Sequence, residues 1–251
     1  MKRLLIEQLK TWHKKADRLP LILRGARQVG KTWLLKEFGR TCFKNMCYVN
    51  FEQNDSLVNV FAGELTPERI INQLSVYCGF RINANDTLII FDEVQEIPRA
   101  LTSLKYFAEE APEYAICCAG SLLGVAMHKG TSFPVGKVDF LDLYPMSFNE
   151  FLLANGEDML VEYIEKGERD LTPFTKRLTE ILKQYIIVGG MPMAVRKWTD
   201  THDFFAVDDI LHSIISSYEN DFSKHAPKNI VEKIRYVWDS IPTQLAKENK
   251  K

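Results

Sequence analysis

The feature that most limits how this chain can fold is the segment Gly-Ala-Arg-Gln-Val-Gly-Lys-Thr at residues 25–32. It matches the phosphate-binding loop pattern G-x-x-x-x-G-K-[ST], and we call it the P-loop. An apolar run at residues 19–23 precedes it, and a helix-like stretch at residues 33–38 follows. In that order of strand, loop and helix, successive backbone N–H groups and the helix dipole face a bound anion. The segment therefore predicts a nucleotide-binding fold built around a parallel sheet.

Each part of the P-loop has an expected task. Gly25 and Gly30 allow backbone conformations and close approaches to phosphate that a side chain would block. Lys31 is expected to reach the β- and γ-phosphates, and the Thr32 hydroxyl is expected to ligate Mg²⁺. The other residues expected to contact the nucleotide are Ala26, Arg27, Gln28, Val29 and Trp33.

A second signal is the segment Leu-Ile-Ile-Phe-Asp-Glu-Val-Gln at residues 88–95. Asp92 stands at the carboxyl end of an apolar strand, where it can face the P-loop across the top of a parallel sheet. A site that hydrolyses a triphosphate needs an acid on the metal side and a base that orients water. We predict Asp92, with Thr32, on the metal side and Glu93 as the catalytic base, with ATP and Mg²⁺ bound.

Ser121 completes the predicted catalytic set with Lys31 and Glu93. It follows the fourth apolar run at the same edge of the sheet, where its hydroxyl can touch the γ-phosphate or the attacking water. The same residue can instead cap the helix that follows, and the sequence does not separate these two roles.

Motifs that the sequence lacks argue against some other classes of nucleotide-binding enzyme. No N-K-x-D occurs, and Asp92 is followed by Glu-Val-Gln instead of the D-x-x-G of a GTPase, so guanine specificity is not expected. A helicase would need a second lobe, which 251 residues do not supply. Small-molecule kinases use the same loop without a glutamate beside the metal aspartate, and they stay open as an alternative.

The pattern of apolar segments predicts the fold class. Near-continuous apolar runs that alternate with helical stretches indicate a parallel sheet covered on both faces. We expect an α/β sandwich of the P-loop NTPase type, with a five-stranded parallel sheet, over residues 1–145. An all-α lid over residues 146–200 and a helical segment over residues 201–251 follow, because no convincing strand appears after Pro145. The runs predicted as strands are Leu19–Leu23, Cys47–Phe51, Thr87–Phe91, Tyr114–Ala119 and Val138–Leu143.

The amino-acid composition limits the classes of partner that we expect for this protein. With 32 basic and 33 acidic residues, the net charge of -1 gives no overall attraction to nucleic acid or to an anionic membrane. The 5 cysteines are odd in number and contain no C-x-x-C pair, so neither a disulfide framework nor a zinc site is expected. The basic start lacks the apolar core of a signal peptide, and no apolar run reaches the ~18 residues of a membrane span. We expect a soluble protein of the cytoplasm.

With these residues placed, the chain resembles the AAA+ ATPases. It is more closely similar to a large prokaryotic family of uncharacterised ATP-binding proteins related to the archaeal-type and STAND ATPases. The P-loop and the acidic strand are specific to the broad superfamily, whereas Pro-Met-Ser-Phe-Asn-Glu-Phe and Gly-Gly-x-Pro narrow the resemblance. It covers nearly the whole chain and rests on LILRGARQVGKTWLLKEFG (21–39), YVNFE (48–52), TLIIFDEVQEIPRALTSLKYF (87–107), AGSLLG (119–124), FPVGKVDFLDLYPMSFNEFL (133–152) and YIIVGGMP (185–192).

The resemblance implies a central loop strand and a nucleotide bound between the core and the helical lid. Gly190-Met191-Pro192 is similar to a G-x-P motif that lies against the adenine in STAND relatives, so Gly190 and Pro192 join the expected ATP contacts. Family members usually continue into a winged-helix-like region, and residues 201–251 resemble the start of that region, cut short. The resemblance therefore implies further sequence beyond this segment.

One departure from the family concerns the arginine that often acts as a finger or sensor. Near the end of the core, this chain has Lys137, which cannot fork two donors to a phosphate. Arg99 and Arg196 are weak substitutes. A finger raises the rate by about 10³ to 10⁵. Turnover should therefore be slow unless an arginine is supplied by a second copy of the chain, by a partner protein or from elsewhere in this chain.

Two classes of function follow from these residues. In the first, slow hydrolysis of ATP moves the lid against the core. In the second, ATP binding orders a docking surface and hydrolysis is negligible. Lys31, Thr32 and Asp92 serve both, whereas Glu93 separates them. DNA association through the missing region is a third idea, which the neutral charge balance does not support.

Overall fold

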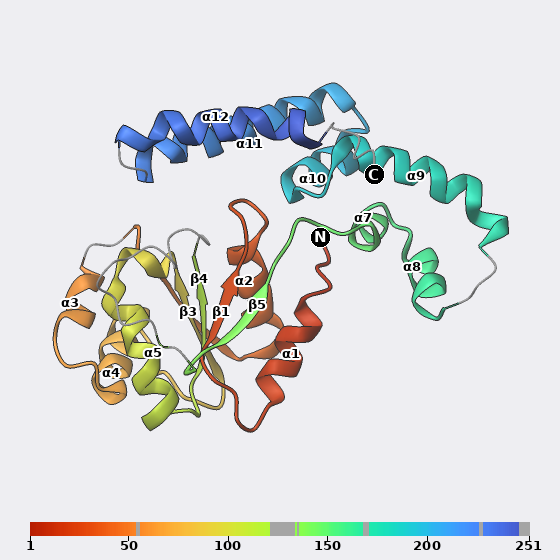
Figure 1. Ribbon diagram of the computed structural model, residues 1–251. Coiled ribbons are helices and arrows are strands. Elements are labelled where there is room, and N and C mark those ends of the chain that lie inside the picture. Colours follow the sequence, from red (N-terminus) through yellow and green to blue (C-terminus); the bar gives the residue numbers. More distant parts are fainter. Residues whose placement is uncertain (54–55, 121–133, 135, 168–170, 226–227, 246–251) are drawn as a thin grey trace.

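The computed structural model describes residues 1–53, 56–120, 134, 136–167, 171–225 and 228–245. Five strands form one sheet in the order β2-β3-β4-β1-β5, and every neighbouring pair is parallel (Figure 1). Each lies within a residue or two of its predicted run. The predicted α/β class and five-stranded parallel sheet are confirmed. The strands are β1 (Leu21–Arg24), β2 (Asn45–Asn50), β3 (Thr87–Asp92), β4 (Ala115–Ala119) and β5 (Asp139–Asp142).

Helices cover both faces of the sheet because successive side chains of a strand point to opposite sides. In β1, Leu21 and Leu23 pack with α1 and α2, whereas Ile22 belongs to the hydrophobic cluster on the other face. That second cluster includes side chains from α3, α4 and α5. The helices of this core are α1 (Ile6–Lys14), α2 (Lys31–Cys42), α3 (Leu57–Ala62), α4 (Pro67–Cys78), the 3₁₀ turn η1 (Val94–Glu96) and α5 (Pro98–Glu110).

Two details of the sheet differ from expectation. The strand before the P-loop lies between β4 and β5, and the central strand is β4. The last strand, β5, is an edge, and Phe140 in it is 38 % exposed. An edge strand is less covered than an interior one, so its sequence Asp-Phe-Leu-Asp does not need the continuous apolar character of its neighbours.

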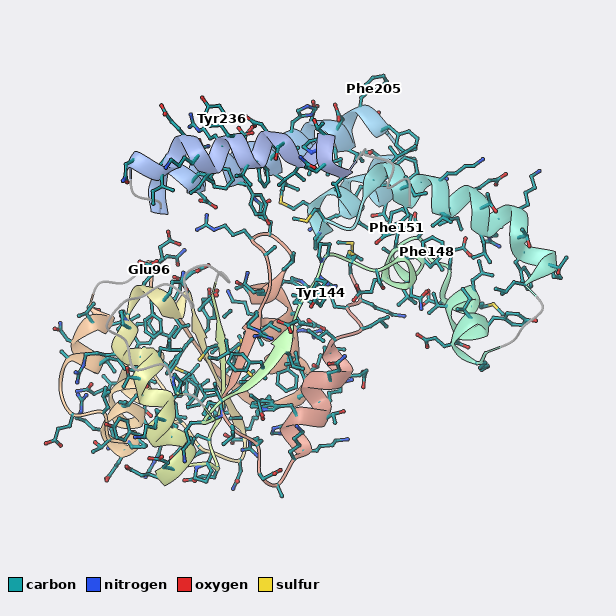
Figure 2. All side chains as sticks on the ribbon, viewed as in Figure 1. Glu96, Tyr144, Phe148, Phe151, Phe205 and Tyr236 are labelled. Atoms are coloured by element: carbon teal, nitrogen blue, oxygen red, sulfur yellow. A yellow bond between two sulfur atoms is a disulfide. The ribbon has the colours of Figure 1, made fainter. Side chains whose placement is uncertain are left out.

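The chain is helical after β5 throughout the described ranges, as predicted. The predicted capping box is present: the Ser147 hydroxyl accepts from the Glu150 N–H, and the Glu150 carboxylate accepts from the Ser147 N–H. A third hydrophobic cluster holds most of these helices together, with Phe151 of α7 buried inside it (Figure 2). The elements are α7 (Phe148–Ala154), α8 (Asp158–Glu165), η2 (Thr172–Phe174), α9 (Thr175–Val188), α10 (Pro192–Thr201), α11 (Phe204–His225) and α12 (Lys228–Leu245).

The two longest helices, α11 and α12, lie along each other above the carboxyl end of the sheet (Figure 1). Their outer surfaces expose large apolar side chains, among them Phe205 at 86 % and Tyr236 at 75 % (Figure 2). Charged and polar residues interrupt both helices, and within the described ranges no helix is long and apolar enough to cross a membrane.

A disulfide corrects the expectation drawn from the cysteines. Cys47 of β2 and Cys78 at the end of α4 are bonded, with Cα atoms 5.9 Å apart. They are separated by 31 residues in the sequence, and only the packing of α4 on the sheet brings them together. Spacing alone therefore did not reveal the pair. Cys117 and Cys118 are free and fully buried in β4, where the burial raises the pKa of both thiols.

Candidate functional site

The P-loop joins β1 to α2 and owes its shape to two glycines. Gly25 has φ +156°, and a Cβ atom there would lie 2.3 Å from the carbonyl oxygen of Leu143. Gly30, with φ +94°, begins α2 in the left-handed region that favours glycine. Gln28 also has a positive φ, of 64°. The backbone therefore folds back tightly over the N-terminus of α2, the geometry in which loop N–H groups converge on an anion.

Lys31 lies inside the curve of the loop. Only 9 % of the residue is exposed, and its Nζ donates to the carbonyl oxygens of Gly25 at 2.8 Å and Ala26 at 2.9 Å. Burial lowers the pKa of this ammonium, and the nearby carboxylates of Glu93 and Asp92 oppose that shift. The structure thus holds a desolvated cation at the base of the loop.

Asp92, at the end of β3, faces the first turn of α2. Its Oδ2 accepts hydrogen bonds of 2.8 Å from the Thr32 hydroxyl and 2.8 Å from the Tyr48 hydroxyl. Asp92 is 3 % exposed, so these bonds compensate for the burial of its charge. Hydroxyl and carboxylate oxygens are the hard donors that Mg²⁺ prefers, and the pair therefore fits the predicted metal site.

Glu93 follows Asp92, and its carboxylate has a different hydrogen-bond partner. Its backbone is left-handed, with φ 52°, and its Oε2 accepts a 2.6 Å hydrogen bond from Nε2 of Gln95. Its N–H donates to Oδ1 of Asp92 at 3.2 Å. A non-glycine residue in this region of φ is uncommon and clusters at functional sites. The structure thus gives the two neighbouring acids different surroundings.

The remaining predicted polar residues divide into two groups. Ser121 lies outside the described residues. The three cations considered as phosphate partners have other contacts: Lys137 pairs with Glu109, Arg99 donates to the carbonyls of Phe61 and Gly63, and Arg196 pairs with Asp200. None of these contacts involves a residue of the P-loop.

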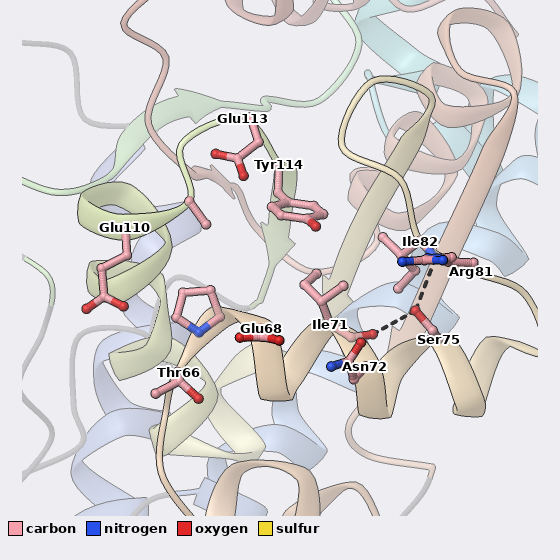
Figure 3. A pocket seen from close by; sticks show the side chains of 12 residues that line it. Thr66, Glu68, Ile71, Asn72, Ser75, Arg81, Ile82, Glu110, Glu113 and Tyr114 are labelled. Atoms are coloured by element: carbon pink, nitrogen blue, oxygen red, sulfur yellow. Dashed lines mark hydrogen bonds between the residues drawn. The ribbon is translucent and has the colours of Figure 1, made fainter.

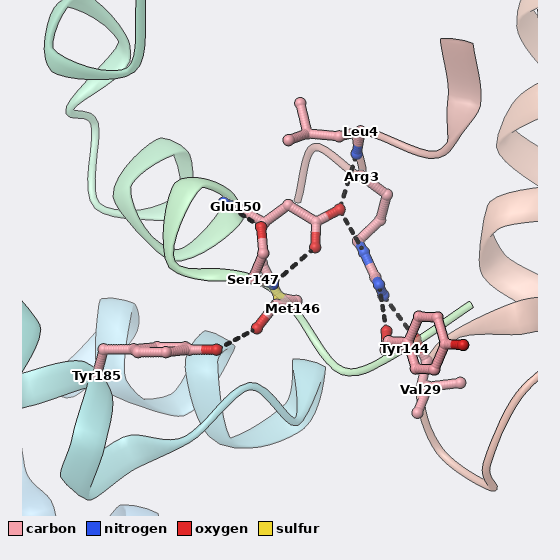
Figure 4. Close-up of polar contacts among 8 residues, drawn as sticks. All are labelled: Arg3, Leu4, Val29, Tyr144, Met146, Ser147, Glu150 and Tyr185. Atoms are coloured by element: carbon pink, nitrogen blue, oxygen red, sulfur yellow. Dashed lines mark hydrogen bonds and ion pairs between the residues drawn. The ribbon is translucent and has the colours of Figure 1, made fainter. Parts of the chain in front are cut away.

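Arg3 ties the P-loop to the helical region, and no sequence pattern indicated this (Figure 4). Its guanidinium donates to the carbonyl oxygens of Val29 and Tyr144, at 2.6 Å each. Its Nε donates to the Glu150 carboxylate at 3.0 Å, and the two side chains are 4 % and 7 % exposed. A buried guanidinium therefore spans the N-terminal segment, the P-loop and the start of α7.

The Gly190-Met191-Pro192 segment lies close to the P-loop. A Cβ atom on Gly30 would lie 3.9 Å from Cγ of Pro192. Gly190 packs against the chain that leaves the sheet: its carbonyl accepts from the Met146 N–H at 2.6 Å, and a Cβ on it would lie 2.3 Å from the Met146 oxygen. The glycine is required by this close approach.

Helix α11 also reaches the P-loop, which the sequence did not predict. Arg27 forms an ion pair with Asp221, and the Gln28 side-chain amide donates to the Ser217 hydroxyl at 2.6 Å. The Tyr218 hydroxyl donates to the Arg27 carbonyl oxygen at 2.8 Å. Two consecutive loop residues are therefore in polar contact with one face of α11.

Two hollows lie on the surface of the core. One, of about 520 Å³, is lined by the N-terminal segment and by the start of α2, including the half-exposed Trp33. The other, of about 510 Å³, lies between Thr66 and Tyr114, at the amino end of β4 (Figure 3). Since the P-loop is at the carboxyl ends of the strands, the second hollow is remote from it.

The sheet topology, the P-loop and the acidic strand end define the class of P-loop ATPase-type domains. The chain belongs to the AAA domain family, whose model matches residues 17–152, more than half of its length. This membership supports a nucleotide-binding, ATPase-type function and confirms the predicted resemblance at that level. Residues 179–251 match a second family, described as a domain of unknown function (DUF8612). Comparison with curated proteins gives no significant match.

Solved structures are similar in fold only. PCH-2 of C. elegans has a TM-score of 0.44 and 14 % identity, over 82 % of this chain and 66 % of that one. Drosophila ORC bound to DNA has a TM-score of 0.47 and 13 % identity, over 98 % of this chain and 67 % of that one. This chain thus spans about two thirds of each of those chains, and these similarities bear on no further property.

Proposed function

We propose that this protein binds ATP with Mg²⁺ and hydrolyses it slowly, using the cycle to move the helical lid. The observation that carries the proposal is the convergence of Lys31, Thr32, Asp92 and Glu93 at the carboxyl ends of β1 and β3. Family membership supports nucleotide binding in general. That the nucleotide is ATP, that Mg²⁺ binds with it and that the protein hydrolyses it are parts of this proposal.

The loop residues divide the work of binding the triphosphate. Backbone N–H groups of residues 25–32 surround the phosphates, and Lys31 exchanges its two carbonyl partners for β- and γ-phosphate oxygens. Thr32 and Asp92 hold Mg²⁺, which neutralises charge on the phosphates when bound. Tyr48 keeps Asp92 oriented through its hydroxyl.

Glu93 accepts the proton of the attacking water in this proposal. Its carboxylate accepts from Gln95, whereas the Asp92 carboxylate accepts from hydroxyl groups, so one acid serves the metal and the other serves the water. Turnover is slow because Arg99, Arg196 and Lys137 all have partners elsewhere. A second copy of the chain, or a partner protein, would accelerate it by adding an arginine.

In this proposal, the lid supplies the side of the nucleotide site that binds the adenine. We assign the core to residues 1–145, the lid to 146–200 and the C-terminal helical segment to 201–251. Gly190 and Pro192 contact the adenine, which the closeness of Pro192 to Gly30 supports. Trp33 is assigned to the same set of nucleotide contacts, because it directly follows Thr32 in the sequence and lines one of the two hollows.

A non-hydrolysing scaffold is the second candidate. Arg3 favours it, because its bonds already hold the P-loop and the start of α7 together without any step of chemistry. In that case ATP binding orders a surface, and Glu93 has a structural role.

We also propose that the chain belongs to the archaeal-type and STAND branch of these ATPases.

The expected location is the cytoplasm. A reducing compartment keeps most cysteines as thiols, so Cys47 and Cys78 should be bonded only after oxidation. Alkylation of the protein in intact cells, followed by mass spectrometry, tests this location. A fully formed Cys47–Cys78 bond in fresh cell extracts would contradict it.

One experiment tests the main proposal. The purified chain is titrated with ATP and with ADP by calorimetry, and phosphate release is measured across protein concentration. We expect Mg²⁺-dependent ATP binding and slow release that increases more than proportionally with concentration. Binding without any release would favour the scaffold, and the absence of binding would overturn both.

A further inference from the structure

Arg27 stands at a variable position of the P-loop pattern, and its side chain is paired with a residue outside the core. Its guanidinium pairs with Asp221 of α11, and the two side chains are 35 % and 19 % exposed. We propose that Arg27 is a phosphate-binding and specificity-determining residue of the P-loop, and that Asp221 competes with the nucleotide phosphates for it. This inference rests on the proposed ATP binding and concerns the same site.

The position of Arg27 supports the first half of the proposal. It directly follows Ala26, whose carbonyl oxygen accepts from the Lys31 ammonium at 2.9 Å. The Arg27 side chain therefore starts one residue from the place where Lys31 would meet the phosphates. Arginine presents a rigid fork of N–H donors that matches the oxygens of a carboxylate or a phosphate equally well.

The position of Asp221 supports the second half. A carboxylate and a phosphate are both anionic oxygen acceptors, and the same donors of one fork cannot serve both at once. While Asp221 holds the guanidinium, its negative charge also lies beside the place where the triphosphate must bind. The negative charge of Asp221 therefore opposes nucleotide binding in two ways, by occupying a donor and by repelling the phosphates.

The competition has a structural consequence for the C-terminal helices. α11 meets the P-loop through Arg27, through the Ser217 contact with Gln28, and through Tyr218. Tyr218 in turn stacks on Trp238 of α12, with ring centroids 6.0 Å apart. When the phosphates take Arg27, α11 loses its ionic contact with the loop, and α12 follows α11. ATP carries one phosphate more than ADP, so it should displace Asp221 more completely.

A double-mutant cycle on the full chain tests the competition. ATP affinity is measured by calorimetry for wild type, Arg27→Gln, Asp221→Asn and the double variant. Asp221→Asn should strengthen ATP binding about threefold to tenfold, the scale of a typical hydrogen bond, because the pair is partly exposed. Arg27→Gln should weaken it about tenfold, and in that background Asp221→Asn should have a clearly smaller effect, because only the repulsion of the phosphates then remains.

Asp209→Asn is the matched control, because this exposed carboxylate lies on the same helix about 18 Å from Asp221. It should leave ATP affinity unchanged. Lys31→Ala separates the two levels of the proposal. If ATP binding depends on Lys31 but Asp221→Asn has no effect, only this inference is wrong. If wild type binds no ATP, the proposed function fails and the inference fails with it.

A cross-link measures the helix itself. Gln28→Cys with Ser217→Cys places two thiols on the facing sides of a side-chain contact, and a short bifunctional maleimide should join them. Gln28→Cys with Ser216→Cys, at an exposed position that points elsewhere on α11, should join far more slowly. ATP should slow the first reaction at least threefold, and ADP should slow it less. An unchanged rate at saturating ATP would overturn the proposal.

Discussion

The Thr32 hydroxyl donates to Oδ2 of Asp92 over 2.8 Å, which joins the end of the P-loop to the end of β3. The two residues are 60 positions apart in the sequence and come from separate strand–loop units. Their contact gives the sheet one corner where a hydroxyl and a buried carboxylate meet beside the Lys31 ammonium. The first predictions concern this corner.

Lys31→Ala should lower ATP affinity by about 10² or more, because it removes a cation that makes two charge-assisted contacts. The fold should persist, since the side chain bonds only to loop carbonyls. Calorimetry gives the affinity, and circular dichroism checks the fold. Lys10→Ala, on the exposed side of α1, should change neither measurement. Unchanged affinity in Lys31→Ala would refute the P-loop assignment.

ATP should be preferred to GTP, because the sequence has no guanine motif and Pro192 lies near the P-loop. The measurement is competition of each nucleotide against a fluorescent ATP analogue. GTP should displace the analogue only at clearly higher concentration than ATP. Equal competition would remove the adenine assignment of Gly190 and Pro192.

Glu93 and Asp92 should give different phenotypes. Glu93→Gln keeps the size of the side chain but cannot accept a proton, so ATP should bind while hydrolysis falls by ~10² or more. Asp92→Asn should instead weaken Mg²⁺-dependent binding, because it removes the charge on the metal side. Binding and single-turnover phosphate release at saturating Mg²⁺ separate the two effects. Identical release by wild type and Glu93→Gln would favour the scaffold.

Arg3→Met should destabilise the protein by about 3–5 kcal/mol, because it leaves the buried Glu150 carboxylate without a cationic partner. Lys2→Met removes the neighbouring ion pair with Asp158, which is exposed, and should cost only about 0–1 kcal/mol. Urea unfolding gives both values. Equal losses would show that the Arg3 cluster carries no more stability than a surface pair.

Tyr48 should make stability depend on alkaline pH. Burial, followed by the hydrogen bond to Asp92, raises the pKa of this phenol from 10.0 to about 12. A raised pKa means that the folded protein favours the protonated form. The resulting stability is fully present below pH 10 and is lost as the pH rises toward 12. Between pH 10 and pH 12, the free energy of unfolding measured in urea should therefore fall more steeply with pH in wild type than in Tyr48→Phe. Parallel curves of unfolding free energy against pH would contradict the shift in pKa.

Local patterns were enough to predict the strands, the P-loop and the Ser147 cap. Each depends on residues within a few positions, such as an apolar run or a capping box, and each was found at its expected place. The edge strand β5 shows the limit of this reasoning, since exposure depends on neighbours that the run itself does not specify.

The contacts that complete the site are long-range and left no local pattern. Arg3 and Glu150 are 147 residues apart, and Arg27 and Asp221 are 194 apart. Tyr48 reaches Asp92 only because β2 and β3 are paired in register. One sequence read in isolation assigns no partner to a lone arginine or tyrosine, so these contacts were identified only in the fold.

The order of the strands affects how the protein is made on the ribosome. β1 emerges first, but its two partners in the sheet are β4 and β5, the last strands of the core to be synthesised. Until residue 142 has left the exit tunnel, at least one edge of β1 has no partner strand. The P-loop then lacks the rigid strand that shapes it. The nascent chain therefore gains its phosphate-binding geometry only when the whole core has been translated, and nucleotide added during synthesis should bind finished cores in preference to partial ones.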